Sequence, residues 1–175
     1  LCVDVTESVI DEALSLDANL VVSHHPLLFH PLRQLVDADF TQRIVRRALL
    51  AGISLYAAHT NLDSAAGGMS FRLGKQLGLT AMRVLSPRRD GAETGFGVVG
   101  DLPEAIPVSG FLQQVKSVLR CGAIRHSELC REQVRRVALV TGAGASMLGD
   151  AVAAGADIYL TADMKYNDFY APDGR

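Results

Sequence analysis

Hydrophobic positions follow two different spacings along this chain. Short continuous apolar runs such as Leu20-Val21-Val22 predict buried strands. Over residues 7–16 the apolar side chains recur every three or four positions, which predicts an amphipathic helix with Thr6 at its N-cap. By the same criteria we expect strands at 1–5, 20–22, 53–58, 81–85, 96–102, 137–141 and 158–161, and helices at 7–16, 41–51, 69–77, 108–119 and 146–154.

The predicted strands and helices alternate, an order that is typical of βαβ units. We therefore expect an α/β fold with two similar lobes, in which mostly parallel sheets are flanked by helices in three layers (α/β/α). Residues 86–95 contain Pro87, a cluster of charges and two glycines, which indicate a boundary. The predicted N-terminal lobe spans residues 1–88, and the predicted C-terminal lobe spans residues 95–175.

Composition excludes several classes of protein. Hydrophobic residues make up 49% and charged residues 21% of the 175, which is ordinary for a globular protein and argues against disorder. The net charge is -2 and basic runs do not exceed pairs, so a nucleic-acid groove is disfavoured. No apolar run approaches the ~20 residues of a membrane span, so we expect no membrane partner.

The cysteines and the first residues bear on the compartment. Three cysteines without CxxC spacing disfavour a disulfide framework and a cysteine-rich zinc site, and favour reduced thiols in a cytoplasmic protein. Residues 1–5 lack the basic region and cleavage site of a signal peptide. They also lack an initiator Met, so we expect the natural protein to begin earlier.

Polar side chains follow three of the predicted strands at the point where each strand ends. His24 and His25 come directly after one strand, His59 and Asp63 after the next, and Asp163 after the last. Because ligands gather beyond the carboxyl ends of parallel strands, we expect these groups at one edge of the sheet. Imidazole nitrogens and carboxylate oxygens bind divalent transition metals, so this pattern predicts a metal site.

The chemistry of such a site would be hydrolytic. His24 and His25 lie where Pro26 breaks the strand, so both rings can turn toward one cavity and bind two neighbouring ions. The carboxylate of Asp63 has two oxygens and can bridge the ions. Two metals roughly 3.5–4 Å apart generate a nucleophile from water and stabilise negative charge. The alternative is that these are ordinary polar loop residues, since a His-His pair alone is a weak signal.

The other candidates point to structural roles. His30 lies in an apolar loop, and His126 lies in a polar stretch that we expect at the surface. Residues 141–146 form a glycine turn before a predicted helix, whose amides could hold a phosphate, but they lack the P-loop lysine and the third glycine of a dinucleotide site. A tight strand-to-helix turn is favoured there.

Taken together, these segments resemble the GTP cyclohydrolase I type 2 homologue family, also called the Nif-three-like family. The resemblance spans nearly the whole chain, in the correct order. It rests on Asp4-Val5-Thr6, Ser23-His24-His25-Pro26-Leu27 with Phe29, Ala58-His59-Thr60-Asn61-Leu62-Asp63, Gly68, Leu77-Gly78-Leu79, Gly97 to Leu102, Val137-Ala138-Leu139, Gly142-Ala143-Gly144, and Gly155-Ala156-Asp157 running into Thr161 to Tyr166.

The resemblance implies a two-lobed α/β fold with a dinuclear metal site. It maps metal ligation onto His24, His25 and Asp63, and it leaves His59 for an orienting or proton-transfer role, which we assign as catalytic. The cofactors would be two divalent ions, with zinc, iron and manganese all suited to these ligands. The resemblance also implies a ring-shaped homohexamer.

Two departures from the family pattern are apparent. The family completes its metal site with a His-x-x-x-Glu motif near the C-terminus, and this chain stops at Arg175 before such a motif. The Trp-Asp-Asn-type segment with which the family begins is absent, and the chain contains no Trp. Some members carry an inserted domain, whose expected position is at residues 86–95.

Two functions follow from the resemblance. The first is a metal-dependent hydrolase acting on a nucleotide or a related small molecule. The second is a non-catalytic metal-binding oligomer that serves as a scaffold or a chaperone-like protein. No sequence feature indicates recognition of a guanine base.

Overall fold

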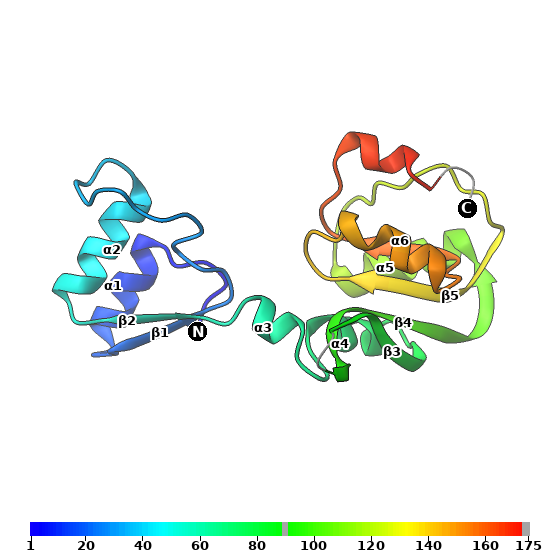
Figure 1. Ribbon diagram of the computed structural model, residues 1–175, viewed down its shortest axis with the longest axis horizontal. Helices are drawn as coiled ribbons and strands as arrows, with labels where there is room; N and C mark the ends of the chain where they lie inside the picture. Colours follow the sequence, from blue (N-terminus) through cyan, green and yellow to red (C-terminus); the bar gives the residue numbers. More distant parts are fainter. Residues whose placement is uncertain (89–90, 173–175) are drawn as a thin grey trace. The chain divides into compact units, whose positions relative to one another are not determined.

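The computed structural model describes residues 1–88 and 91–172, and the chain divides into two compact units, Leu1–Leu62 and Asp63–Arg175 (Figure 1). Both units combine helices with a β-sheet, so the predicted α/β class is confirmed. The division falls after Leu62 rather than in residues 86–95, where the sequence analysis placed it. Of that predicted boundary, residues 89–90 lie outside the described residues.

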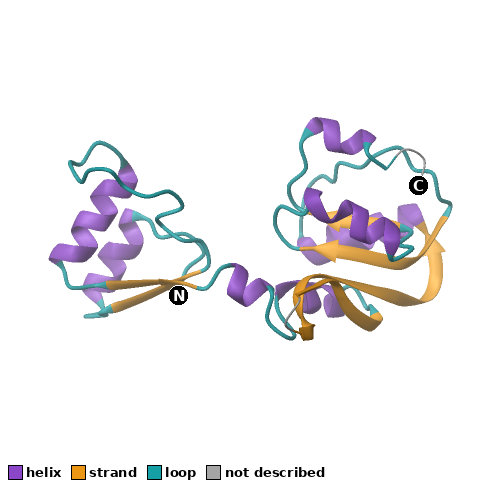
Figure 2. Cartoon of the chain, viewed as in Figure 1, coloured by secondary structure: helices purple, strands orange, loops and turns teal. Residues whose placement is uncertain are grey.

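The first unit is a βαβ arrangement preceded by a helix. Strands β1 (Leu20–Ser23) and β2 (Ser54–Ala57) pair in parallel, and α2 (Phe40–Leu50) connects them. Helix α1 (Glu7–Ser15) begins where predicted, because the side chain of Thr6 accepts a hydrogen bond from the Val9 amide at 3.3 Å. Figure 2 shows both helices on the same side of the strand pair. The buried core consists of Val5, Ile10, Ala13, Val21, Ile44, Ala48 and Ile53.

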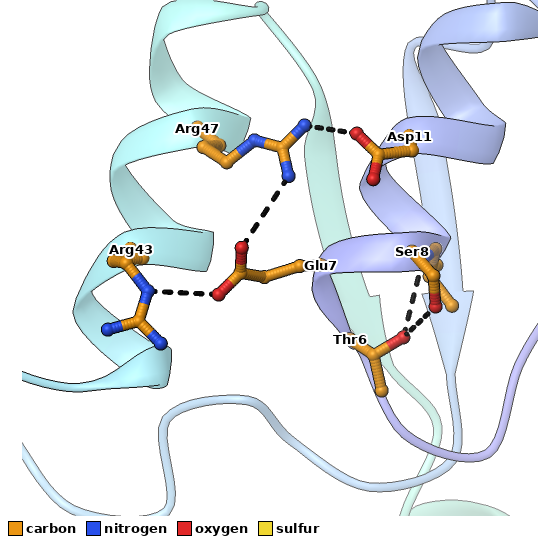
Figure 3. A network of polar contacts seen from close by, with 7 residues as sticks. Thr6, Glu7, Ser8, Asp11, Arg43 and Arg47 are labelled. Atoms are coloured by element: carbon orange, nitrogen blue, oxygen red, sulfur yellow. Dashed lines mark hydrogen bonds and ion pairs between the residues drawn. The ribbon is translucent and has the colours of Figure 1, made fainter.

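Charged side chains link the two helices at their solvent-facing side. Arg43 Nε donates to Glu7 Oε1 at 2.9 Å, and Arg47 lies between Glu7 and Asp11 (Figure 3). The hydrogen bond with Asp11 raises the pKa of Arg47 above its ordinary value. Exposed ion pairs contribute little to stability, so the packing of α1 against α2 depends mainly on the buried apolar contacts.

The second unit contains a four-stranded sheet in the order β3-β4-β5-β6. The strands are β3 (Thr80–Arg88), β4 (Gly91–Pro107), β5 (Gln133–Val140) and β6 (Ile158–Thr161). The helices are α3 (Thr60–Asp63), which begins in the first unit, α4 (Met69–Gln76), α5 (Val108–Leu119) and α6 (Leu148–Ala153), with single 3-10 turns at Ala145–Met147 and Tyr166–Tyr170.

This sheet corrects the expectation of mostly parallel pairing. The β3–β4 and β4–β5 pairs are antiparallel, and the β5–β6 pair is parallel. The proline and glycines of residues 86–95 were interpreted as a boundary, but β3 and β4 pair with each other across this segment. An antiparallel pair can be joined by a short connection, whereas a parallel pair needs a crossover, which α6 supplies between β5 and β6.

Helices cover both faces of this sheet. Val98, Val137 and Leu139 pack with Phe111 of α5 in one buried cluster. Their sequence neighbours Val99, Ala138 and Val140 pack with Ala151 of α6 in another. Because successive side chains of a strand point to opposite faces, continuous apolar runs such as Val137–Val140 indicate a sheet buried on both sides. The predicted three layers are therefore present within the second unit.

Two further points concern the expected elements. The predicted strand at residues 1–5 is reduced to one isolated bridge, between Cys2 and Ser23. Among the described residues, no helix combines the length and the apolarity needed to cross a lipid bilayer.

We expect Asp101 to stabilise the folded state above about pH 4 and to lose this contribution as pH falls further. Its carboxylate accepts hydrogen bonds from Arg136 Nε at 2.8 Å and Nη2 at 3.2 Å, across the β4–β5 pair. This contact lowers the pKa of Asp101 below its ordinary value of 3.8. A carboxyl whose pKa is lower in the folded state stabilises that state above its unfolded pKa, and the contribution is lost as pH falls through the folded pKa.

Urea unfolding of Asp101→Asn measures this dependence. The variant should be less stable than the wild type at pH 6, and the difference should shrink as pH falls below about 3.8 toward 2. Glu104→Gln, an exposed position on the same strand, is the matched control and should leave the profile unchanged. An equal deficit at every pH would mean that the side-chain charge plays no part.

Candidate metal centre

The candidate site forms where the two parallel strands of the first unit end. Strand β1 ends at Ser23 and β2 ends at Ala57, so His24 and His59 follow two neighbouring strands at their carboxyl ends. The Ala58 amide donates to the Ser23 carbonyl at 2.8 Å and extends the pairing by one residue. The parallel pairing therefore brings segments more than 30 residues apart in sequence to one sheet edge.

The N-terminal segment runs along the other side of β1. The Cys2 amide donates to the Val22 carbonyl at 3.1 Å, and the His24 amide donates back to the Cys2 carbonyl at 3.1 Å. The His25 amide donates to the Val3 carbonyl at 2.9 Å. These bonds hold both histidine backbones and place the next residue of the N-terminal segment, Asp4, beside His25.

Three imidazoles meet at this edge. One ring nitrogen from each of His24, His25 and His59 lies within 4.8 Å of the others. The ring centroids are 5.0 Å apart for His24 and His25, 5.3 Å for His24 and His59, and 5.7 Å for His25 and His59. His25 is exposed and the other two are partly buried, so solvent reaches the cluster. The structure thus brings together three of the four predicted site residues.

Hydrogen bonds determine which nitrogen each ring can offer. His24 Nδ1 lies 2.8 Å from the Ala58 carbonyl oxygen, and His25 Nδ1 lies 2.8 Å from Asp4 Oδ1. A carbonyl or carboxylate oxygen only accepts, so each Nδ1 carries the proton and donates. The lone pair of a neutral ring is then on Nε2, as a metal ligand requires. The buried hydroxyl of Ser23 donates to the His25 carbonyl at 2.8 Å and holds this turn in place.

This donor set fits a divalent transition metal. Imidazole nitrogens suit zinc, iron, manganese and related ions. Histidine ligands are commonly oriented by a hydrogen bond from their second nitrogen to a carbonyl or carboxylate, and His24 and His25 both have one. Among the described residues, His59 makes no side-chain hydrogen bond, so its ring differs from the other two.

Asp63, the fourth predicted site residue, has a different position. It is the last residue of α3 and the first residue of the second unit, and its side chain is partly buried. The three-histidine cluster lies wholly in the first unit. Ligation by Asp63 therefore stays a prediction. Asp163 follows β6 in the second unit and is exposed.

Two residues at the cluster were not singled out as functional from the sequence. Asp4 contacts His25, and its only sequence signal was its place in the Asp4-Val5-Thr6 motif of the resemblance. Phe29 places its ring 6.0 Å from that of His59 in an edge-on arrangement, and its side chain is 70% exposed. Neither contact is visible in spacing, because the first depends on the N-terminal segment running beside β1 and the second on the loop that follows His25.

The glycine turn after β5 is structural. Thr161 Oγ1 donates to the Gly142 carbonyl at 2.8 Å and accepts from the Gly144 amide at 3.0 Å, while Tyr159 Oη donates to the Gly144 carbonyl at 2.7 Å. Burial raises the pKa of this Tyr159 hydroxyl to about 12. A Cβ at Gly144 would lie 2.4 Å from Tyr159 Oη. The turn uses these polar groups internally, which favours the tight-turn interpretation over a phosphate site.

A cavity of about 640 Å³ lies elsewhere, inside the second unit. Its walls are mainly apolar and include Phe111, Val115 and Leu160 together with residues 123–131. None of the predicted site residues lines it. The cavity is therefore separate from the histidine cluster.

Comparison with known proteins places the chain among a defined set of relatives. Residues 1–173 match the family model described as Duf34/NIF3 (NGG1p interacting factor 3). The chain is 33% identical over 167 residues to a Clostridium perfringens protein named GTP cyclohydrolase 1 type 2 homolog, covering 95% of this chain and 64% of that protein. A Streptomyces coelicolor protein of the same name is 34% identical over 169 residues, covering 94% and 59%. The chain thus spans less than two thirds of the length of these relatives.

Solved structures share the fold. A Bacillus cereus protein related to NIF3 superposes with a TM-score of 0.86 at 24% identity, covering 97% of this chain and 73% of that one. The Staphylococcus aureus protein SA1388 gives a TM-score of 0.86 at 24% identity, covering 97% and 69%. At this level of identity, the likeness concerns the fold alone.

Proposed function

This chain belongs to the Duf34/NIF3 family, and on that premise we propose that it is a metal-dependent hydrolase acting on a nucleotide or a related small molecule. The observation that carries the proposal is the meeting of three imidazoles within 4.8 Å, two of them oriented through Nδ1. Such orientation costs conformational freedom of the side chain. It is the arrangement that metal-binding histidines require.

The metal ligands in this proposal are His24, His25 and Asp63. The two oriented imidazoles would provide nitrogen donors and the carboxylate of Asp63 would provide oxygen donors to divalent ions, for which zinc, iron and manganese are suited. When bound, divalent ions activate water as a nucleophile and stabilise developing negative charge. The hydrogen bonds at Nδ1 leave Nε2 of both imidazoles unprotonated, so that it would be available to hold an ion.

His59 has the proton-transfer role. Its ring lies beside both proposed ligands, but among the described residues no hydrogen bond fixes which of its nitrogens carries the proton. A ring without an orienting partner can accept a proton at one nitrogen and release one from the other. A neutral imidazole can act as a general acid or base in such an exchange.

The aromatic ring of Phe29, beside His59, supports the proposal that the substrate contains a planar ring. Phe29 is 70% exposed and its ring lies 6.0 Å from that of His59 in an edge-on arrangement, so a largely solvent-exposed aromatic ring lies beside the cluster. A nucleobase stacks well on such a ring, and stacking on aromatic side chains contributes about 1–3 kcal/mol per base. Stacking does not select one base, so the substrate class is a nucleotide or a similar planar ring compound.

The setting proposed for this activity is a cytoplasmic homohexamer. Residues 28–40 expose several large apolar side chains, namely Leu28, Phe29, Leu32, Leu35, Val36 and Phe40. Exposed apolar patches often mark interfaces, which supports self-association. The same exposed segment favours the second candidate function, a metal-binding oligomer that acts as a scaffold without turnover.

Metal content and turnover test the two functions separately. Elemental analysis of the purified protein should find at least one equivalent of a transition metal per chain, and less than about half an equivalent would contradict the metal proposal, given the tight binding of multi-ligand sites. Incubation with a panel of nucleoside mono-, di- and triphosphates should release product from at least one of them, and chelator-treated protein should release none. Bound metal without any turnover would favour the scaffold.

A further inference from the structure

We propose that Asp4 is a positioning residue that fixes the tautomer and ring orientation of His25 for metal ligation. This inference rests on the proposed metal site. Its direct observation is the 2.8 Å contact between Asp4 Oδ1 and His25 Nδ1. Asp4 lies 21 residues before His25 in sequence, so local chain geometry does not impose the contact.

The backbone around Asp4 is held on both sides. Before it, the carbonyls of Cys2 and Val3 accept hydrogen bonds from the His24 and His25 amides at 3.1 and 2.9 Å. After it, Val5 is 5% exposed within the core of the first unit, and Thr6 caps α1. The Asp4 carboxylate therefore extends from a fixed stretch of backbone. Only the few torsion angles of its side chain have to be ordered for the carboxylate to reach the His25 ring.

The contact has a defined chemical consequence. A carboxylate can only accept from a neutral ring, so Nδ1 of His25 carries the proton and Nε2 keeps its lone pair. A negatively charged acceptor also makes the imidazole a stronger electron donor to a metal. His24 is oriented differently, because its partner is the neutral carbonyl of Ala58. The two imidazoles are thus inequivalent, and only the orientation of His25 depends on a replaceable side chain.

Solvent limits the size of the effect. The side chain of Asp4 is 66% exposed and that of His25 is 48% exposed, so water screens the contact. Removing a residue that orients a metal-binding histidine lowers metal affinity by roughly 10–100-fold. Because both side chains are exposed, we expect the effect of Asp4→Ala to lie at the lower end of this range, at about a 10-fold loss of Zn²⁺ affinity.

Two measurements on the metal-free and Zn²⁺-bound protein test this role. Imidazole ¹⁵N chemical shifts at about pH 8 should show His25 protonated at Nδ1 in the wild type. In Asp4→Ala the Nε2-protonated tautomer should gain population, while the shifts of His24 stay unchanged. Competition with a chromogenic chelator should then show the weaker Zn²⁺ binding.

Two further variants separate orientation from charge. Asp4→Asn keeps an accepting oxygen without the charge, so it should preserve the His25 tautomer and recover part of the affinity. Glu12→Gln removes one negative charge from an exposed position of α1 and should change neither measurement. An unchanged tautomer in Asp4→Ala would overturn the proposal, as would equal Zn²⁺ affinity of that variant and the wild type.

These measurements also distinguish failure of the proposed metal-dependent function from failure of the proposed role of Asp4. If wild-type protein binds no Zn²⁺, the metal-dependent function fails, and with it the purpose assigned to Asp4. The tautomer measurement on metal-free protein then still decides whether Asp4 orients His25. If Zn²⁺ binds tightly but Asp4→Ala behaves as wild type, the metal site stands and the positioning role fails.

Discussion

Replacing His24 with alanine is expected to lower the affinity of the protein for Zn²⁺ by about 100-fold or more, because the loss of a ligand exceeds the roughly 10–100-fold cost of removing a residue that merely orients one. His24 is oriented by the Ala58 carbonyl at 2.8 Å and lies beside both other imidazoles. Metal-dependent nucleotide turnover should be lost with the metal.

Chelator competition followed by turnover assays measures both effects. His126→Ala is the matched control, because this exposed histidine lies in the second unit and contacts the Ser127 carbonyl, so metal affinity should be unchanged. His59→Ala should keep most of the metal and lose turnover, as its proton-transfer role requires. Full Zn²⁺ affinity in His24→Ala would remove His24 from the ligand set, and loss of metal in His59→Ala would make His59 a third ligand.

Gly97→Ala is expected to destabilise the second unit by about 2–4 kcal/mol. Gly97 lies within β4 at a φ of +68°, a left-handed conformation that costs a residue with a Cβ about 1–2 kcal/mol. The added Cβ would also lie 2.6 Å from Val140 Cγ2 and 2.9 Å from the Leu139 carbonyl oxygen. The Val140 side chain can move aside, but the backbone at Leu139 can move only if the β4–β5 pairing is disturbed.

Gly110→Ala on α5 is the matched control for this substitution. Gly110 has helical backbone geometry, and a Cβ there would meet nothing within 4 Å. Alanine in a helix is favoured over glycine by about 0.5–1 kcal/mol, so this variant should be slightly stabilised. Urea unfolding followed by far-ultraviolet circular dichroism compares the two, and equal stability of Gly97→Ala and the wild type would contradict the steric argument.

The five helices expected from sequence were placed to within two residues at each end, whereas the short helix α3 (Thr60–Asp63) was not predicted. The segment expected at 108–119 is α5 (Val108–Leu119), and the one expected at 41–51 is α2 (Phe40–Leu50). Helical spacing and the residues at helix ends are local properties, so they can be recognised in the sequence. The pairing of strands was less accessible, because residues 86–95 carry turn-forming residues that suit a hairpin as well as a domain boundary.

For the candidate site too, local sequence features were predictable and contacts between distant segments were not. Position after a strand end was enough to single out His24, His25 and His59, because parallel strands deliver such residues to one edge. Asp4 carried no comparable signal. Its contact with His25 depends on the N-terminal segment running beside β1, which is made by backbone hydrogen bonds that do not depend on side-chain identity.

The sequence by itself determined the α/β class, the family, the positions of five helices and the three histidines at the strand ends, since each of these follows from local spacing or from a motif. Only the tertiary structure decided the mixed pairing of the second sheet, the partner of each imidazole and the left-handed backbone at Gly97. The physical reason is that these depend on contacts between segments distant in sequence. Such contacts form when the packing of a whole unit compensates the entropy of bringing them together.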